Sequence, residues 1–264
     1  YKDINPICVY YKTGYIFNDR IIANTNEYAV ISINDLFGLL EKFENKITSD
    51  IFRGYYKYIS SLKDSYDKKE SDYINNLHSH IGQFTLMSKL VPYFNDMVKS
   101  KADYENEIHP IIVDRMELGQ NIGGAPWTQY TLLFKEDSKP VSERWVPFSD
   151  SYVDNIFCRI DRNKNGYYFS IRQYNHYNND KDKIAVRLPL LRGLFAKAVK
   201  EVEDERSDRV PPLKLAHYFK NDNKGKFESK IADIYLDKLD KEDLRILIEL
   251  LPIALGKFID LIKL

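Results

Sequence analysis

Cysteine is scarce in this chain of 264 residues, which contains only Cys8 and Cys158. Two thiols cannot build the disulfide framework of a small secreted domain, so we expect buried, reduced cysteines and a cytoplasmic protein. Net charge is absent as well, because 39 Lys and Arg balance 39 Asp and Glu. A chain without an overall positive field can bind nucleic acid only if its basic residues gather on one face.

The sequence also has no apolar run long enough to cross a membrane. The C-terminal stretch "ILIELLPIALGKFIDLIKL" comes nearest, but charged residues and Pro252 interrupt it. We therefore predict no membrane partner and a helix over about 240–263. Its apolar residues form either the core, which we prefer, or a contact between subunits of a homo-oligomer; they are Leu239, Leu247, Leu250, Leu251, Ala254 and Phe258.

Short apolar and aromatic runs at residues 6–14 and 27–33 predict two buried strands. Ser32 and Asp35 then form a capping-box pattern at the start of a helix. Strand, loop, strand and helix in this order are typical of the end of an α/β sheet. From Ser49 to about Ser100 the apolar spacing is helical.

From Trp127 the apolar period changes to two, which predicts an antiparallel meander, and helical spacing returns at 190–206. The predicted fold class is α+β, in three parts. Residues 1–47 would be the remnant of an α/β core, residues 48–120 a helical arm, and residues 121–264 an antiparallel sheet with flanking helices.

The segment "DRNKNG", Asp161 to Gly166, spells the opening of an EF-hand calcium loop. An EF-hand needs a carboxylate at loop position twelve and a helix on each side. Position twelve here is Arg172, and the flanking residues alternate with a period of two. We therefore predict a β-hairpin that turns at 163–166 and pairs Arg162 with Tyr167, Ile160 with Phe169, and Cys158 with Ile171.

In that register one face of the hairpin is apolar, and the other combines arginines with aromatic rings. Such surfaces hold phosphates and stack on bases, so Arg159, Arg162, Tyr168 and Arg172 are the candidate nucleic-acid contacts. A second interpretation is a half-exposed sheet whose arginines form cation–π and ion pairs within the protein. The sequence leaves both open.

No catalytic or metal site is predicted. The segment "FENKI" contains the E-x-K of a magnesium-dependent nuclease, with Asp35 as the second acid. Helical spacing there would separate Glu44 from Lys46 by roughly 200°, so we expect a charged helix end. The alternative, an active site of these three residues on a strand, remains to be tested. His78 and His80 have no third ligand at a recognisable spacing.

The N-terminal third resembles bacterial proteins of the PD-(D/E)XK nuclease superfamily. The resemblance rests on "INPICVYYKTGY", "EYAVISINDLFGLLEKF" and "ITSDIFRGYYKYISSL", with weaker similarity in "GGAPWTQYTLLF" and "FCRIDRNKNGYYFSIRQYN". It implies that the catalytic Asp and E-x-K lie on strands upstream of Tyr1, so no catalytic residue is assigned in this chain. A complete parent nuclease would use Mg²⁺, and this part has no expected cofactor.

Two functions are consistent with these features. The first is nucleic-acid engagement or positioning by the C-terminal portion of a nuclease-like protein. The alternative is a non-enzymatic protein-interaction module, for instance in a phage-defence system. The 20 tyrosines and 14 phenylalanines favour the alternative, since aromatic residues anchor protein interfaces.

Overall fold

The computed structural model describes residues 8–11, 15, 28–91, 111–136, 138, 140, 145–146, 156–174, 181–205 and 228–262. The chain divides into two compact units, Tyr1–Thr85 and Leu86–Leu264. Helices and an antiparallel sheet occur together, so the fold is α+β, as predicted. The boundary between the units falls within the segment predicted as a helical arm.

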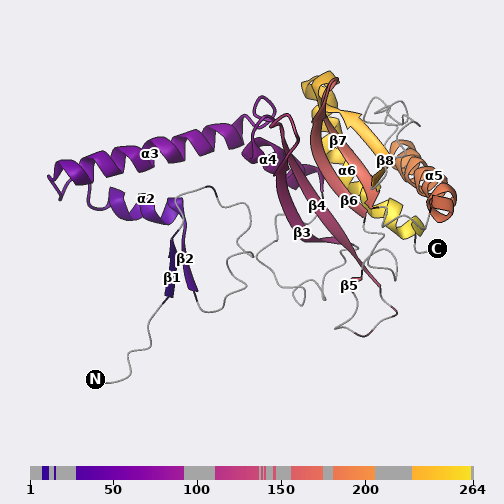
Figure 1. Cartoon of the computed structure of the whole chain (residues 1–264), viewed down its shortest axis with the longest axis horizontal. Helices are drawn as coiled ribbons and strands as arrows, with labels where there is room; N and C mark the ends of the chain where they lie inside the picture. The colour runs from indigo at the N-terminus through magenta and orange to yellow at the C-terminus, as the bar shows by residue number, and fades with distance from the viewer. Residues whose placement is uncertain are drawn as a thin grey trace. The chain divides into compact units, whose positions relative to one another are not determined.

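The first unit begins with two parallel strands, β1 (Cys8–Tyr11) and β2 (Tyr28–Ile31). Helix α2 (Ile33–Glu41) follows β2, and the longer α3 (Asp50–Ser71) comes next (Figure 1). The capping box is formed as predicted. The Ser32 hydroxyl accepts from the Asp35 N–H at 3.2 Å, and the Asp35 carboxylate accepts from the Ser32 N–H at 2.9 Å.

The core of this unit lies between α2 and α3. Its buried residues are Ile33, Leu36, Leu40 and Ile59. Phe37 and Tyr56 stack beside them with ring centroids 5.7 Å apart. The core therefore joins the predicted α/β element to the helical segment that follows it.

Helix α4 (His80–Leu90) follows α3, and residues 92–100 of the predicted helical region lie outside the described part of the chain. Strand β3 (Ile111–Gln120) corrects the prediction, because we had placed it in the helical arm. A register shift between Val113 and Arg115 explains the error. Ile111, Val113 and Met116 are buried, so the bulge breaks the alternation by which a strand is recognised.

The second unit is built on an antiparallel sheet of six strands (Figure 1). Besides β3 they are β4 (Pro126–Lys135), β5 (Trp145–Val146), β6 (Ile156–Asn163), β7 (Gly166–Tyr174) and β8 (Glu228–Tyr235). The strand order is β3-β4-β6-β7-β8, and β5 pairs with β4. The predicted antiparallel strands β4 to β7 are present, but β4 pairs directly with β6 and β5 lies off this path, so the order is not that of a simple meander. Strand β8 was not predicted. Residues 151–155, which we included in the strand before the hairpin, lie outside the described residues.

The second unit also contains two long helices, α5 (Lys181–Glu205) and α6 (Lys241–Ile262). They pack together through Phe195 and Phe258, whose rings meet edge to face at 5.4 Å. The Lys257 ammonium lies 2.7 Å from the Glu205 carboxylate at the same contact. Helix α5 begins earlier than the predicted residue 190 and continues through Pro189.

The apolar stripe of α6 is buried within this single chain. Of the six residues predicted to form it, five are buried: Leu247, Leu250, Leu251, Ala254 and Phe258. This burial agrees with the core interpretation, and a homo-oligomer formed through α6 remains a prediction. Among the described residues, no helix combines the length and the hydropathy of a membrane span.

Candidate nucleic-acid interface

The hairpin of β6 and β7 has the predicted register, with Arg162 opposite Tyr167 and Ile160 opposite Phe169. Gly166 adopts a positive φ of 115°, a conformation that a residue with a Cβ rarely takes. The end of β8 and the segment after it contact the turn. Asp237 accepts from the Tyr167 N–H at 2.9 Å, and the Tyr235 hydroxyl accepts from the Asn163 amide at 3.0 Å.

Because side chains alternate along a strand, the register assigns each residue of the hairpin to one face of the sheet. Ile160, Phe169 and Ile171 lie on the apolar face. The opposite face, which we call the polar face, includes Trp127, Gln129, Phe157, Arg159, Asp161, Tyr168, Ser170, Arg172, Glu228, Lys230 and Asp233. Arg162 is exposed and belongs to the apolar side, so the structure brings together three of the four predicted contacts.

Two arginines of the polar face converge on one carboxylate, that of Glu228. Atom Nη1 of Arg159 lies 3.1 Å and 3.2 Å from the two carboxylate oxygens. Atom Nη1 of Arg172 lies 2.5 Å from Oε2 of the same group. Three strands contribute to this site, because Glu228 begins β8 while the arginines come from β6 and β7. The arrangement holds a single two-oxygen anion between two guanidinium groups.

Arg172 is held by further partners on the same face. Its guanidinium lies 3.3 Å from Asp161 and donates to the Tyr168 hydroxyl at 2.9 Å and to Ser170 at 2.7 Å. Burial by itself would lower the pKa of Arg172. The interactions with Tyr168, Glu228 and Asp161 outweigh this effect, so the pKa of Arg172 is raised. Arg172 is therefore a fixed charge.

Tyr168 lies between two cations. The Lys230 ammonium is 3.9 Å from the ring centroid, and the guanidinium carbon of Arg172 is 5.6 Å from it. Burial raises the pKa of the Tyr168 phenol to about 12, so the group stays neutral over the physiological range. As a neutral phenol it accepts from Arg172 and places its aromatic face against Lys230.

Arg159 is stacked on Trp127, with its guanidinium carbon 4.3 Å from the ring centroid. Gly119 on the neighbouring strand makes this possible, since a Cβ there would lie 2.2 Å from the indole ring. Burial, followed by the nearby charge of Arg172, lowers the pKa of Arg159. Its side chain is 14% exposed, against 6% for Arg172, so Arg159 is the more accessible arginine of the pair.

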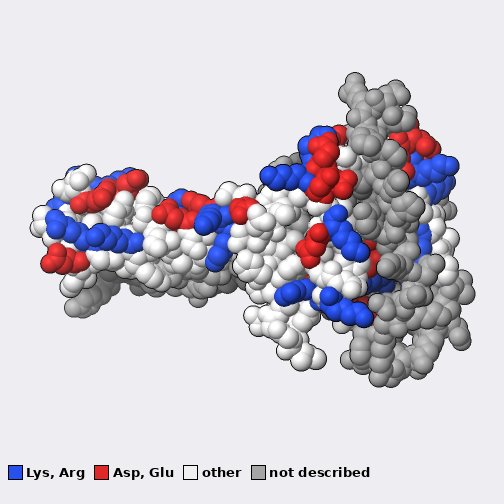
Figure 2. All heavy atoms as spheres, turned by 90° about the horizontal axis from the view of Figure 1, so that it is seen from above, with Lys and Arg blue, Asp and Glu red and all other residues white. Residues whose placement is uncertain are grey.

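Six charged residues grouped around Tyr168 and Ser170 balance one another, and a further carboxylate of the same face, Glu117, accepts from Gln129 at 2.7 Å. Arg159, Arg172 and Lys230 are matched by Asp161, Glu228 and Asp233, three positive groups against three negative ones. Figure 2 shows a comparable mixture on the surface that it displays, where basic and acidic side chains are interspersed among the described residues.

Comparisons with protein-family models, curated proteins and solved structures found no match. The resemblance to nucleases thus remains an expectation from the sequence.

The alternative active site of Asp35, Glu44 and Lys46 is wrong. Glu44 and Lys46 lie in an exposed turned segment after α2, not on a strand, and Asp35 caps the other end of that helix. No group of three His, Cys, Asp or Glu residues in the described parts of the chain is placed to hold a metal ion.

Sequence reasoning missed Glu228, the residue that joins the two arginines, and Trp127, on which Arg159 stacks. A strand assignment for residues 228–235 would have placed Glu228 and Lys230 on one side of the sheet. The alternation there is concealed by the register shift opposite Ile171 and Arg172.

Proposed function

We propose that this chain engages nucleic acid and that Arg159 and Arg172 hold a backbone phosphate in place of the Glu228 carboxylate. The observation that carries the proposal is the convergence of both guanidinium groups on one carboxylate. Bidentate recognition of a two-oxygen anion is the geometry by which arginine binds phosphate.

The charge balance favours such an exchange. A phosphodiester carries one negative charge, as Glu228 does, so exchanging one for the other leaves the site neutral. Glu228 is also the most exposed member of the cluster, with 26% of its side chain accessible. Its departure would uncover Arg159, which stacks on Trp127, before the deeper Arg172.

The proposed role is substrate engagement or positioning within a nuclease-like protein, and no step of a cleavage reaction is assigned to this chain. The parallel pairing of β1 with β2, followed by α2, supports the relation to a nuclease-like core. Parallel strands occur mainly in α/β sheets, so a parallel pair is what the end of an α/β core would contain.

Fluorescence anisotropy with single-stranded DNA and RNA oligonucleotides at low salt tests the proposal. Arg159→Gln is expected to weaken binding by about tenfold and to reduce the dependence of affinity on salt. Arg162→Gln is the matched control, because it removes an arginine from the same hairpin on the opposite face. Equal losses in the two variants, or no binding by the unmodified chain, would show that the assignment is wrong.

A second candidate function is protein interaction, favoured by an exposed apolar stripe on α3. Ile51, Tyr55 and Tyr58 have the spacing of one helix face, and Ile51 is 86% exposed. Size-exclusion chromatography with light scattering, with and without an oligonucleotide, separates the two functions. A salt-insensitive association that Ile51→Lys abolishes would favour the interaction module.

A further inference from the structure

The first unit contains a cavity beyond the ends of its two parallel strands. Since β1 and β2 are parallel, their carboxyl ends lie at the same edge. Tyr15 follows the last residue of β1 by four positions, and Ser32 directly follows β2. Both residues line a cavity of about 250 Å³. The crevice outside the carboxyl ends of parallel strands is the usual ligand position in open α/β sheets.

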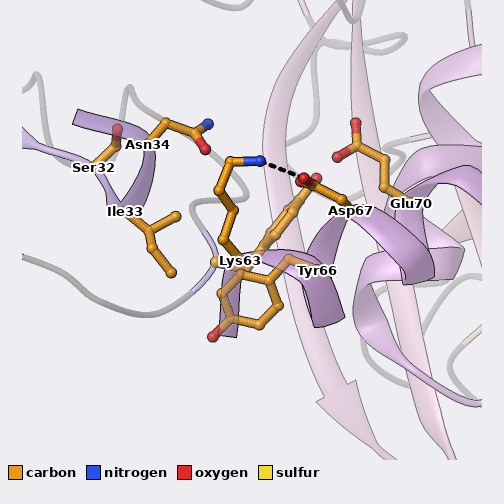
Figure 3. Close-up of a pocket in the computed structure, with 8 residues that line it drawn as sticks. Ser32, Ile33, Asn34, Lys63, Tyr66, Asp67 and Glu70 are labelled. Carbon is orange, nitrogen blue, oxygen red and sulfur yellow. Dashed lines mark hydrogen bonds and ion pairs between the residues drawn. The ribbon is translucent and has the colours of Figure 1, made fainter. Parts of the chain in front are cut away.

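Helix α3 supplies the opposite wall of the cavity. Its lining residues, Lys63, Tyr66, Asp67 and Glu70, are spaced so that they lie along one face of the helix. Ser32, Ile33 and Asn34 line the cavity from the start of α2, as Figure 3 shows. Residues from three separate segments of the chain thus enclose one space.

The described lining carries a net charge of −1, because Lys63 contributes one positive charge and Asp67 and Glu70 contribute two negative ones. Lys63 forms an ion pair with Asp67, drawn as a dashed line in Figure 3. Glu70 accepts a hydrogen bond from Tyr15. Since a carboxylate accepts about four hydrogen bonds, Glu70 keeps acceptor capacity toward a ligand.

Aromatic rings lie beside these carboxylates. The rings of Tyr15 and Tyr66 meet edge to face, with centroids 5.6 Å apart and planes at 83°. A cation gains both from the face of an aromatic ring and from a charge-assisted hydrogen bond to a carboxylate. An anion would meet two carboxylates in the same space. Within the residues that the structure describes, no group of three His, Cys, Asp or Glu residues is placed to hold a metal ion, and this cavity has only two of these side chains.

We propose that this cavity binds a small organic cation, whose ammonium or guanidinium group is held by Glu70 and Asp67 beside the ring of Tyr66. The Asn34 amide, which also lines the cavity in Figure 3, accepts a hydrogen bond from the other end of the same ligand through its oxygen, while Lys63 stays paired with Asp67. The site belongs to the first unit, so it is independent of the proposed nucleic-acid contacts on the sheet.

Isothermal titration calorimetry of the full chain with agmatine tests this inference, since agmatine carries an ammonium and a guanidinium group at its two ends. We expect saturable binding to one site, and no comparable binding of the neutral probe butane-1,4-diol. Glu70→Gln should weaken agmatine binding at least about tenfold, and Glu70→Asp should restore part of the affinity.

Asp64→Asn is the matched control, because it removes the same charge from an exposed position on the same helix outside the cavity. Circular dichroism checks that each variant folds, and if Glu70→Gln does not, Asp67→Asn takes its place with the same expected loss. Equal binding of agmatine and the diol would overturn the proposal. Equal weakening by the control variant and the cavity variant would overturn it as well.

Discussion

Arg172 and Glu228 are 56 residues apart in the sequence, yet atom Nη1 of Arg172 lies 2.5 Å from Oε2 of Glu228. Only 6% of the Arg172 side chain is exposed, so this ion pair is largely removed from water. The contact connects β7 to β8, a strand at the edge of the sheet. The ion pair therefore holds β8 to β7, in addition to being part of the candidate phosphate site.

Arg172→Met should therefore destabilise the protein strongly. The substitution leaves Asp161 without its cation and removes one of the two arginines that hold Glu228, a loss of about 3 kcal/mol for a buried pair. Urea denaturation followed by circular dichroism measures the loss. The exposed pair of Arg245 and Glu242 on α6 provides the control, because Arg245→Met should change stability by less than about 1 kcal/mol. Comparable losses for the two variants would contradict this account of the polar face.

The phenol of Tyr168 should titrate well above an ordinary tyrosine. Its pKa is raised from 10.0 to about 12 because burial disfavours the charged form. Between these values the phenol is ionised in the unfolded state but still protonated in the folded state, so the unfolded state binds fewer protons. The contribution of Tyr168 to the free energy of unfolding is therefore complete below pH 10 and declines as the pH rises toward 12. The difference in ultraviolet absorbance between the unmodified chain and Tyr168→Phe isolates this group. A difference signal that titrates near 10 would show that Tyr168 is not desolvated.

Gly166 is required by the hairpin turn. A Cβ at this position would lie 2.0 Å from the Asp237 carboxylate, and the φ of 115° is unfavourable for any residue that carries one. Gly166→Ala should lower the free energy of unfolding by about 1–3 kcal/mol. Gly256→Ala on α6, where a Cβ meets no atom within 4 Å, should instead stabilise by roughly 0.5–1 kcal/mol. Thermal unfolding of both variants checks the opposite signs.

Cys158 should be inert in the folded protein. It is fully buried, and burial raises the pKa of its thiol, so little of the reactive thiolate forms. In a Cys8→Ser background, the thiol should react with Ellman's reagent only after urea is added. Rapid reaction of the native variant at neutral pH would mean that the interior of the sheet is open to solvent.

The β6–β7 hairpin was predictable to the residue because its signals are local. Asn163 and Gly166 indicate the turn, and the alternation of Cys158 and Ile160 with polar residues determines which side chains pair. The capping box of Ser32 and Asp35 was recognised for the same reason, since its partners are three residues apart.

The features that escaped prediction depend on distant partners or on irregular backbone. Glu228 has its role only because β8 pairs with β7, and the register shift in that pair disrupts the alternation. Strand β3 has a similar shift. Helix α5 continues through Pro189, although the prediction began the helix after it, because proline usually interrupts a helix by removing a hydrogen bond and crowding the preceding turn. The cavity of the first unit combines Tyr15 with residues on α3, a proximity that no local pattern indicates.

The affinity of Glu228→Gln for a fluorescent single-stranded oligonucleotide at low salt tests the central claim most directly. If Glu228 occupies the phosphate site, the neutral amide competes less well for Arg159 and Arg172, and binding should tighten by about tenfold or more. An affinity that stays unchanged or falls in this variant would contradict the account.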